Sequence, residues 1–128
     1  MNTNQGYIAK TYPFPVKRFC RTMDLREDPE LIAEYCKRHS KEEAWPEIRA
    51  GIREVGILEM EIYIMGSHLF MIVETPVDFD WDKAMAQLAQ LPRQQEWETY
   101  MSIFQKCNPT DTANDKWTMM ERIFYLYD

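Results

Sequence analysis

Residues 57–75, ILEMEIYIMGSHLFMIVET, carry the clearest structural pattern in this 128-residue chain. Between residues 57 and 65, aliphatic and methionine side chains at even positions alternate with a second set that includes two glutamates and a tyrosine. Such a period of two is typical of a β-strand. A Gly-Ser pair at 66–67 supplies a two-residue turn, and residues 68–75 are rich in residue types that favour strands. The stretch therefore predicts a β-hairpin.

A strand and two helical segments are predicted before the hairpin. Residues 16–25 mix apolar and polar positions in a nearly alternating pattern, which favours a first strand. Asp28 and the proline after it form a strong helix start, and the helix is expected to continue to residue 43. Pro46 restarts a helix, and Gly56 ends it.

Two helices and a final strand are predicted after the hairpin. Asp80 caps a helix, Pro92 ends it, and a further helix covers residues 93–105. Residues 108–114 are polar and indicate a loop. Residues 117–127, WTMMERIFYLY, predict a last strand because they are rich in aromatic and aliphatic side chains.

The order of elements predicts the fold class. Strand, helix, two strands, helix and strand, with each helix in two pieces, is the split βαβ pattern of an α+β, ferredoxin-like domain. We expect residues 16–128 to form this single domain, after an extended N-terminal arm of residues 1–15. Two helices packed on one face of the sheet cannot cover every apolar strand position, so we expect a homodimer formed through the bare sheet face. The positions concerned are Leu58, Met60, Ile62, Phe70, Ile72 and Phe124.

Charge and cysteine content argue against several classes of protein. The formal net charge is −6, whereas nucleic acids and anionic membranes require a basic surface, so neither is an expected partner. Three widely spaced cysteines without a CxxC pair argue against a disulfide framework or a structural zinc site, and they favour a reducing cytoplasm. No apolar run approaches the roughly 20 residues of a membrane span, and the N-terminus lacks a signal-peptide pattern.

His39 is the main candidate for chemistry, because imidazole exchanges protons near neutral pH. It follows Tyr35 by four residues, so both side chains share one face of the predicted helix. The competing interpretation is a histidine that only stabilises the helix end, where the dipole favours it. His68 opens a strand beside the turn and is expected to be exposed. The two histidines are far apart, and no carboxylate stands beside either at ligand spacing, which argues against a metal site.

The four tryptophans could each stack on the apolar face of a sugar ring, although most tryptophans belong to cores or interfaces. We expect the core or interface role for Trp81 and Trp117. Trp97 lies among charged residues in QQEWETYM, which suggests a partly open position. The sequence contains no Gly-rich phosphate loop, nucleophile elbow or HExxH motif.

Ordered blocks of the sequence resemble the L-rhamnose mutarotase family. They are YCKRH at 35–39, Trp45-Pro46-Glu47-Ile48, Gly56, Ile62-Tyr63, Phe70 with Glu74, Trp97 with Tyr100-Met101, and Glu121 with Phe124-Tyr125-Leu126. The resemblance spans about residues 17–127 and implies a dimeric ferredoxin-like α/β barrel. It also implies an isomerase that interconverts the α and β anomers of L-rhamnose, or of a related 6-deoxyhexose such as L-fucose, without cofactor or metal.

The resemblance assigns site residues as well. The catalytic histidine of the family falls on His39, which would donate a proton, and the sugar-contacting tyrosine and tryptophan fall on Tyr35 and Trp97. Met60 takes the place of another sugar-contacting tyrosine, and Glu98 stands where the family often has a second tryptophan. Mutarotation removes one proton from the C1 hydroxyl and adds one to the ring oxygen, which acid–base groups and positioning can accomplish.

Two other functions fit the same pattern. A haem- or quinol-handling protein of the dimeric α/β barrel group could use one helical histidine, although that analogy rests on the fold alone. A non-catalytic sugar-binding protein would have the same pocket without turnover.

Overall fold

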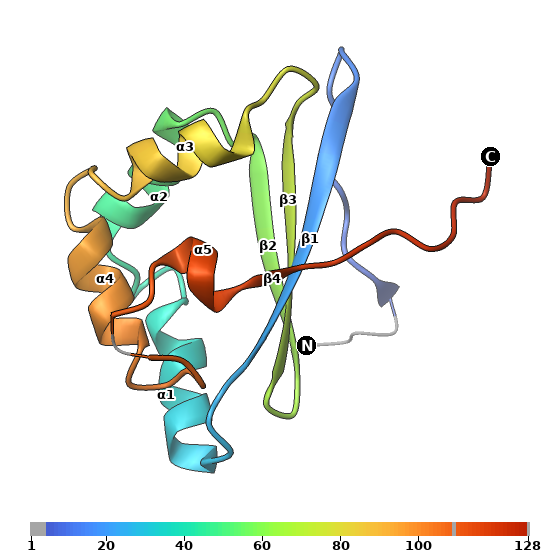
Figure 1. The fold of residues 1–128 in the computed structure, drawn as a ribbon. Helices are drawn as coiled ribbons and strands as arrows, with labels where there is room; N and C mark the ends of the chain where they lie inside the picture. The colour runs from blue at the N-terminus through green and yellow to red at the C-terminus, as the bar shows by residue number, and fades with distance from the viewer. Residues whose placement is uncertain (1–4, 109, 128) are drawn as a thin grey trace.

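The computed structural model describes residues 5–108 and 110–127; the first four residues of the expected arm lie outside this range, as do Pro109 and Asp128. Within it, four antiparallel strands form one sheet in the order β2-β3-β1-β4 (Figure 1). They are β1 (Val16–Asp24), β2 (Glu59–Met65), β3 (His68–Pro76) and β4 (Thr118–Met119). The split βαβ pattern requires this order, so the predicted α+β, ferredoxin-like fold is confirmed.

The predicted hairpin forms from β2 and β3, which pair from Glu59 opposite Glu74 to Met65 opposite His68. Gly66 adopts a positive φ of 62°, which glycine tolerates without a steric penalty and which a two-residue hairpin turn requires. Strand β1 pairs with β3 along all nine of its residues. The hairpin and β1 therefore make up most of the sheet.

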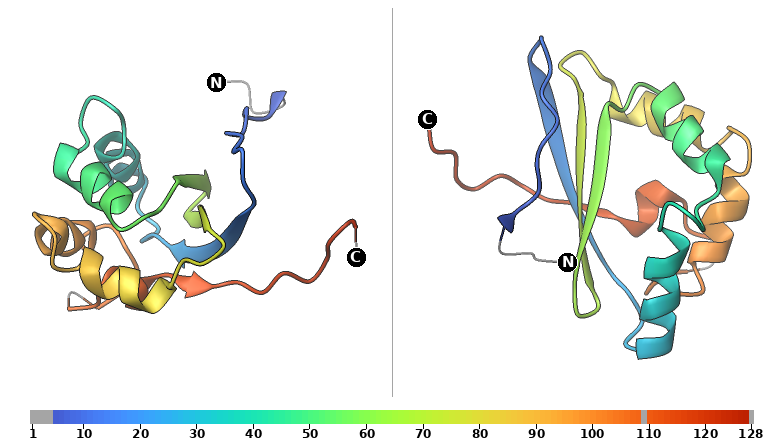
Figure 2. Two further views of the ribbon diagram at one scale, coloured as in Figure 1. Left: turned by 90° about the horizontal axis from the view of Figure 1, so that it is seen from above. Right: turned by 180° about the vertical axis from the view of Figure 1, so that it is seen from behind.

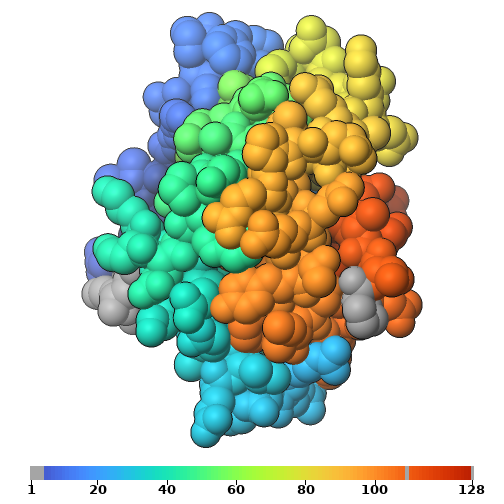
Figure 3. Space-filling model, turned by 90° about the vertical axis from the view of Figure 1, so that its left-hand side faces the viewer, coloured from blue at the N-terminus to red at the C-terminus, as the bar shows by residue number. Residues whose placement is uncertain are grey.

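Five helices lie in the described part of the chain, all on one face of the sheet (Figures 1 and 2). They are α1 (Pro29–Arg38), α2 (Pro46–Glu54), α3 (Trp81–Leu88), α4 (Gln94–Met101) and α5 (Ala113–Lys116). Figure 3 shows the first four packed closely together on this side of the molecule. None of the helices in the described residues is long and apolar enough to cross a membrane.

Local capping determines where the helices begin. Asp28 and Asp80 are the N-caps of α1 and α3, and their carboxylates accept hydrogen bonds from main-chain N–H groups, as predicted. Helix α1 ends at Arg38, earlier than expected, where His39 is its C-cap. Helix α5 begins inside residues 108–114, which were expected to be a loop, and Thr112 starts it with a capping box.

The hydrophobic core fills the space between the sheet and the helices. Alternation along the strands sends every second side chain toward the helices, which are apolar on the facing side. The core includes Met23, Leu69, Met71 and Val73 from the strands, and Tyr35, Ile48, Trp97 and Met101 from the helices.

The expected set of bare apolar strand positions needs correction. Met60 and Ile62 pack against the core on the helix-covered face. The register explains this, because Ile62 pairs with the buried Met71 and therefore shares its face. Phe70 and Ile72 alternate with the buried side chains of β3 and point to the opposite face, which no helix covers.

Part of this open face is crossed by residues 6–15, which contain neither helix nor strand. The ring of Tyr7 packs edge to face on Tyr63, with 5.6 Å between the centroids. The Tyr12 hydroxyl donates a hydrogen bond to Glu74 at 3.5 Å. The arm thus lies over the part of the face formed by β2 and β3.

The predicted strand over residues 117–127 is wrong for most of its length. Strand β4 contains only Thr118 and Met119, which pair with β1 at the edge of the sheet. The chain then leaves the sheet edge, so its β-type sequence has no ladder partner (Figure 1). This segment exposes large apolar side chains, namely Met120, Ile123, Phe124, Tyr125, Leu126 and Tyr127.

Candidate active site

A cavity of about 540 Å³ lies between the sheet and the helices. Its lining comes from β1, β2 and β3 and from all five helices, so it forms only when the two layers come together. The four residues that the sequence assigns to the site all line it: Tyr35, His39, Met60 and Trp97. The fold therefore brings together residues that are far apart in the sequence, such as Tyr35 and Trp97.

His39 is the C-cap of α1, where its main-chain N–H donates to the carbonyl of Cys36. Its ring packs on that of Tyr35 with 4.2 Å between centroids, and it meets Trp97 edge to face at 5.3 Å. Nδ1 lies 2.8 Å from the carbonyl oxygen of Tyr35. The position of His39 is compatible with both interpretations, because the residue ends the helix and also lines the cavity.

The surroundings of His39 favour the neutral imidazole. Burial lowers its pKa below the ordinary value, the bond to the Tyr35 carbonyl works in the opposite direction, and the cation of Arg49 lowers the pKa further. A carbonyl oxygen can only accept a hydrogen bond, so Nδ1 carries a proton. In the neutral ring Nε2 therefore has a free lone pair.

Tyr35 contributes a protonated hydroxyl. The residue is 3% exposed, and burial raises its pKa well above the ordinary value. The Gln105 amide bonds to this hydroxyl and partly offsets the shift, whereas the charge of Glu98 adds to it. Tyr35 can thus donate or accept a hydrogen bond near neutral pH, but it does not ionise.

Trp97 differs from the expectation of a partly open side chain, because it is only 6% exposed. The helical period places it on the inner face of α4 with Gln94 and Met101, while the charged neighbours that suggested exposure lie on other faces. Its ring also meets Trp45 at 5.0 Å. Trp97 is thus a core residue that also borders the cavity.

Trp45 and Met60 complete the apolar part of the lining. Trp45 stacks on the ring of Tyr100 with an interplanar angle of 10°, and the Arg93 guanidinium lies 3.8 Å from its ring centroid. Met60 is half-buried on β2. Together with Trp97 they give the cavity an apolar wall suited to the C–H groups of a small molecule.

Arg21 borders the cavity from β1, a role that sequence reasoning missed. It is 3% exposed, and its Nη2 donates to the carbonyl oxygens of Ala113 and Trp117 at 3.2 and 3.1 Å. Burial lowers its pKa to about 10, so it remains a cation near neutral pH, and its guanidinium lies over Trp81. The signal was present, since a charged residue at an inward strand position indicates a buried cation.

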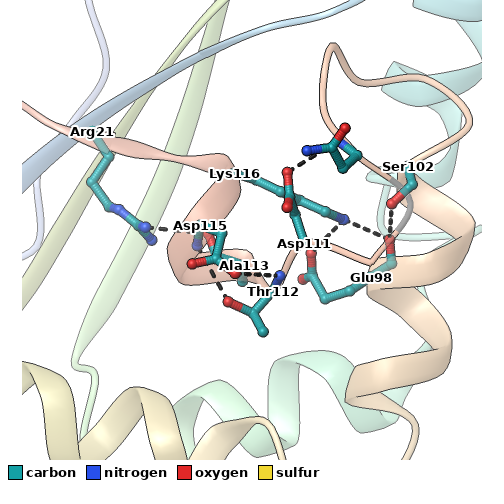
Figure 4. A network of polar contacts seen from close by, with 9 residues as sticks. Arg21, Glu98, Ser102, Asp111, Thr112, Ala113, Asp115 and Lys116 are labelled. Atoms are coloured by element: carbon teal, nitrogen blue, oxygen red, sulfur yellow. Dashed lines mark hydrogen bonds and ion pairs between the residues drawn. The ribbon is translucent and has the colours of Figure 1, made fainter.

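Glu98, which the sequence marks only as a departure from the family pattern, also belongs to the site. It lines the cavity next to Trp97, and its Oε1 accepts a hydrogen bond from Lys116 Nζ at 3.0 Å (Figure 4). No spacing in the sequence links Lys116 to the site, because Lys116 and Glu98 meet only where α5 lies against α4.

His68 and possible metal ligands were also considered in the sequence. His68 is exposed, as predicted, and its Nδ1 lies 2.6 Å from Asp24 Oδ1. Within residues 5–108 and 110–127, no three histidine, cysteine, aspartate or glutamate side chains lie close enough to hold a metal ion.

Comparison with known proteins identifies the family. The sequence matches the family model described as L-rhamnose mutarotase over residues 18–126. The chain belongs to the L-rhamnose mutarotase family. An L-fucose mutarotase of Xanthomonas campestris is 39% identical over 111 residues, which cover 87% of this chain and 89% of that protein. An L-rhamnose mutarotase of Enterococcus faecalis is 33% identical over 95 residues, or 73% of this chain and 82% of that protein.

The fold agrees with this membership. The crystal structure of an L-rhamnose mutarotase from Formosa agariphila matches with a TM-score of 0.62 at 23% identity, over 86% of this chain and 98% of that one. The family resemblance predicted from the sequence is therefore confirmed. These relatives do not favour the haem- or quinol-handling alternative.

Proposed function

We propose that this protein is a mutarotase, an isomerase that interconverts the α and β anomers of L-rhamnose, L-fucose or a closely related 6-deoxyhexose. The observation that carries the proposal is His39, a neutral imidazole with a free Nε2 on the wall of an aromatic-lined cavity, in a chain of the mutarotase family. The relatives named for L-fucose and L-rhamnose support the sugar class.

The proposed mechanism follows from what ring opening requires. As the bond between C1 and the ring oxygen breaks, the C1 hydroxyl loses a proton and the ring oxygen gains one. Neutral His39 takes the hydroxyl proton on Nε2 and then, as the imidazolium, donates a proton to the ring oxygen. The open-chain aldehyde rotates and closes on its other face by the reverse transfers. The expected proton donor thus acts first as an acceptor, because its pKa is lowered.

The neighbours of His39 position the sugar in this proposal. The Tyr35 hydroxyl, which remains protonated, hydrogen-bonds a sugar oxygen. Trp97 and Met60 contact the C–H groups and the methyl group that distinguish a 6-deoxy sugar. Holding the anomeric centre beside Nε2 turns a slow solution reaction into one with a high effective concentration of the acid–base group.

The open face of the sheet supports a homodimer. Phe70 and Ile72 lie on it with Cys20, and the arm crosses only part of it. A second copy of the chain would cover these side chains through a two-fold interface of the same face. The free thiols of all three cysteines are consistent with work in a reducing compartment such as the cytoplasm.

Anomeric exchange measured by saturation-transfer NMR tests the proposed function. We expect the protein to speed exchange of L-rhamnose or L-fucose over the uncatalysed rate, with the same rate in EDTA. Unchanged exchange of every aldose in a broad panel would defeat the enzymatic assignment and leave the non-catalytic sugar-binding alternative. Loss of activity in EDTA would defeat the metal-free mechanism.

A further inference from the structure

The ion pair between Glu98 and Lys116 is unusual because its cation is fully buried. The Lys116 side chain is 0% exposed, whereas that of Glu98 is 24% exposed. Lys116 Nζ donates to Glu98 Oε1 at 3.0 Å and to the main-chain carbonyl of the same residue at 2.6 Å. Figure 4 shows the lysine reaching from α5 to the glutamate on α4. Two hydrogen bonds from the Lys116 ammonium thus hold Glu98 in place.

Stability alone does not explain this arrangement. Removing an ammonium from water is costly, and replacing a buried ion pair by apolar residues of similar volume is often neutral or stabilising. The Lys116 side chain is fully buried, whereas the Glu98 side chain that it holds is partly exposed and lines the cavity. The pair therefore presents an oriented anionic acceptor to whatever occupies the cavity.

The position of Glu98 relative to His39 can be traced through Tyr35. The His39 ring packs on the Tyr35 ring, whereas the Glu98 charge raises the pKa of Tyr35, whose ionising group is the hydroxyl at the far end of that side chain. The same charge raises the pKa of Arg21. The Glu98 charge thus acts on the Tyr35 hydroxyl and on a buried guanidinium, and Glu98 lines the same cavity as His39.

We propose that Glu98, oriented by Lys116, is a specificity-determining residue that accepts hydrogen bonds from the C3 and C4 hydroxyls of the sugar. This inference rests on the proposed function. With the anomeric carbon and ring oxygen at His39, the ring atoms opposite them are C4 and C3, so these hydroxyls face the other end of Tyr35. Lys116 Nζ donates to Glu98 Oε1, which leaves Oε2 to accept hydrogen bonds from these hydroxyls.

The contact would distinguish the two candidate sugars. L-Fucose and L-rhamnose differ in configuration at C2 and C4, so only one of them can present its C4 hydroxyl to a fixed carboxylate. A site built to bond a substrate hydroxyl discriminates against an analogue that cannot make the bond, because the buried polar group is then left unpaired. Glu98 would therefore set the preference between sugars of opposite configuration at C4.

Binding of methyl glycosides tests this inference, because these sugars cannot mutarotate. NMR titrations of the wild-type protein with the methyl α-glycosides of L-fucose and L-rhamnose show which of the two sugars is preferred. We expect Glu98→Gln to weaken binding of the preferred glycoside by about tenfold or more, the usual worth of a bond to a charged group, and to reduce the preference. Glu96→Gln, on an exposed part of the same helix, is the matched control and should change neither quantity.

A 4-deoxy derivative of the preferred glycoside tests the same contact without a variant. It should bind the wild-type protein about tenfold more weakly than the parent sugar and should bind Glu98→Gln no more weakly than the parent does. The inference would be overturned if the wild-type protein bound each glycoside and its 4-deoxy derivative with equal affinity. It would also be overturned if the protein bound neither glycoside. The KM and kcat of anomeric exchange are measured separately. If Glu98→Gln still catalyses exchange with the wild-type KM, the inference is defeated but the proposed function is not.

Discussion

The Nδ1 atom of His39 lies 2.8 Å from the carbonyl oxygen of Tyr35, one helical turn earlier in α1. This bond links the structural and chemical roles of the residue. It stabilises the end of the helix, and it also determines that the second ring nitrogen, Nε2, is the one left free to exchange protons.

The two ring nitrogens of His39 can be tested with a matched pair of substitutions. The amide nitrogen of asparagine can occupy the position of Nδ1, whereas that of glutamine reaches the position of Nε2. We expect both His39→Asn and His39→Gln to slow anomeric exchange by a factor of about 10² or more, the usual contribution of an acid–base group. Only His39→Gln should also lose about 1 kcal/mol of stability, because it cannot keep the bond to Tyr35.

Exchange rates by NMR and melting temperatures separate these outcomes. If His39 served the helix end alone, His39→Gln would be destabilised but would exchange at the wild-type rate per folded molecule.

The lowered pKa of His39 predicts how activity depends on pH. Above the ordinary histidine value of 6.5 the imidazole is neutral and can accept the hydroxyl proton, so the catalysed rate should be flat there. Acidification below the lowered pKa should reduce the rate, because the imidazolium cannot accept a proton. The measurement is the exchange rate against pH after subtraction of the uncatalysed rate; a rate that increases on acidification would contradict acceptance by His39 as the first step.

The same shift contributes to stability, and its sign can be worked out. Because the pKa is lower in the folded state, the unfolded chain takes up the proton first as the pH falls below 6.5. The contribution of His39 to stability is thus present above this pH and is lost as the pH falls through the folded pKa. Urea unfolding of wild type and His39→Asn at several pH values should show the smaller acid dependence in the variant.

Trp97 is expected to matter for folding as well as for sugar. Its side chain is 6% exposed and packs on Trp45, so Trp97→Ala should cost about 3–5 kcal/mol of unfolding free energy through lost contacts and a new cavity. Urea denaturation provides the measurement, with Trp97→Phe as the less disruptive comparison. A fully stable Trp97→Ala protein with weakened sugar binding would instead indicate a purely ligand-facing residue.

The homodimer can be tested on the open face of the sheet. Ile72 lies at the centre of this face, opposite Cys20 on β1 and Glu61 on β2. A charge buried in a dimer interface without a partner is costly, so Ile72→Glu should convert the dimer to a monomer. Sedimentation velocity at micromolar concentration distinguishes the two, with Ala86→Glu on the exposed side of α3 as the control. A wild-type protein that sediments only as a 15.4 kDa monomer would refute the dimer.

The features that could be predicted from the amino-acid order are those that depend on near neighbours in the chain. The alternation of residues 57–65 with the turn at Gly66 predicts the hairpin, and Asp28 and Asp80 predict the starts of two helices. These signals succeed because strand alternation, turn conformation and capping bonds involve residues only a few positions apart. The same holds for the helical spacing that places His39 one turn after Tyr35.

Which faces and ends of the elements acquire partners depends on the folded arrangement of the whole chain. A strand pattern in residues 117–127 produces a ladder only where another strand lies alongside, and that condition ends after Met119. Charged neighbours suggested an open Trp97, but the packing of α4 on the sheet buries it. Lys116 reaches Glu98 because α5 packs against α4, and no period or motif in the sequence encodes a contact between separate elements. Burial and long-range pairing depend on how the layers meet, which is a property of the whole folded chain.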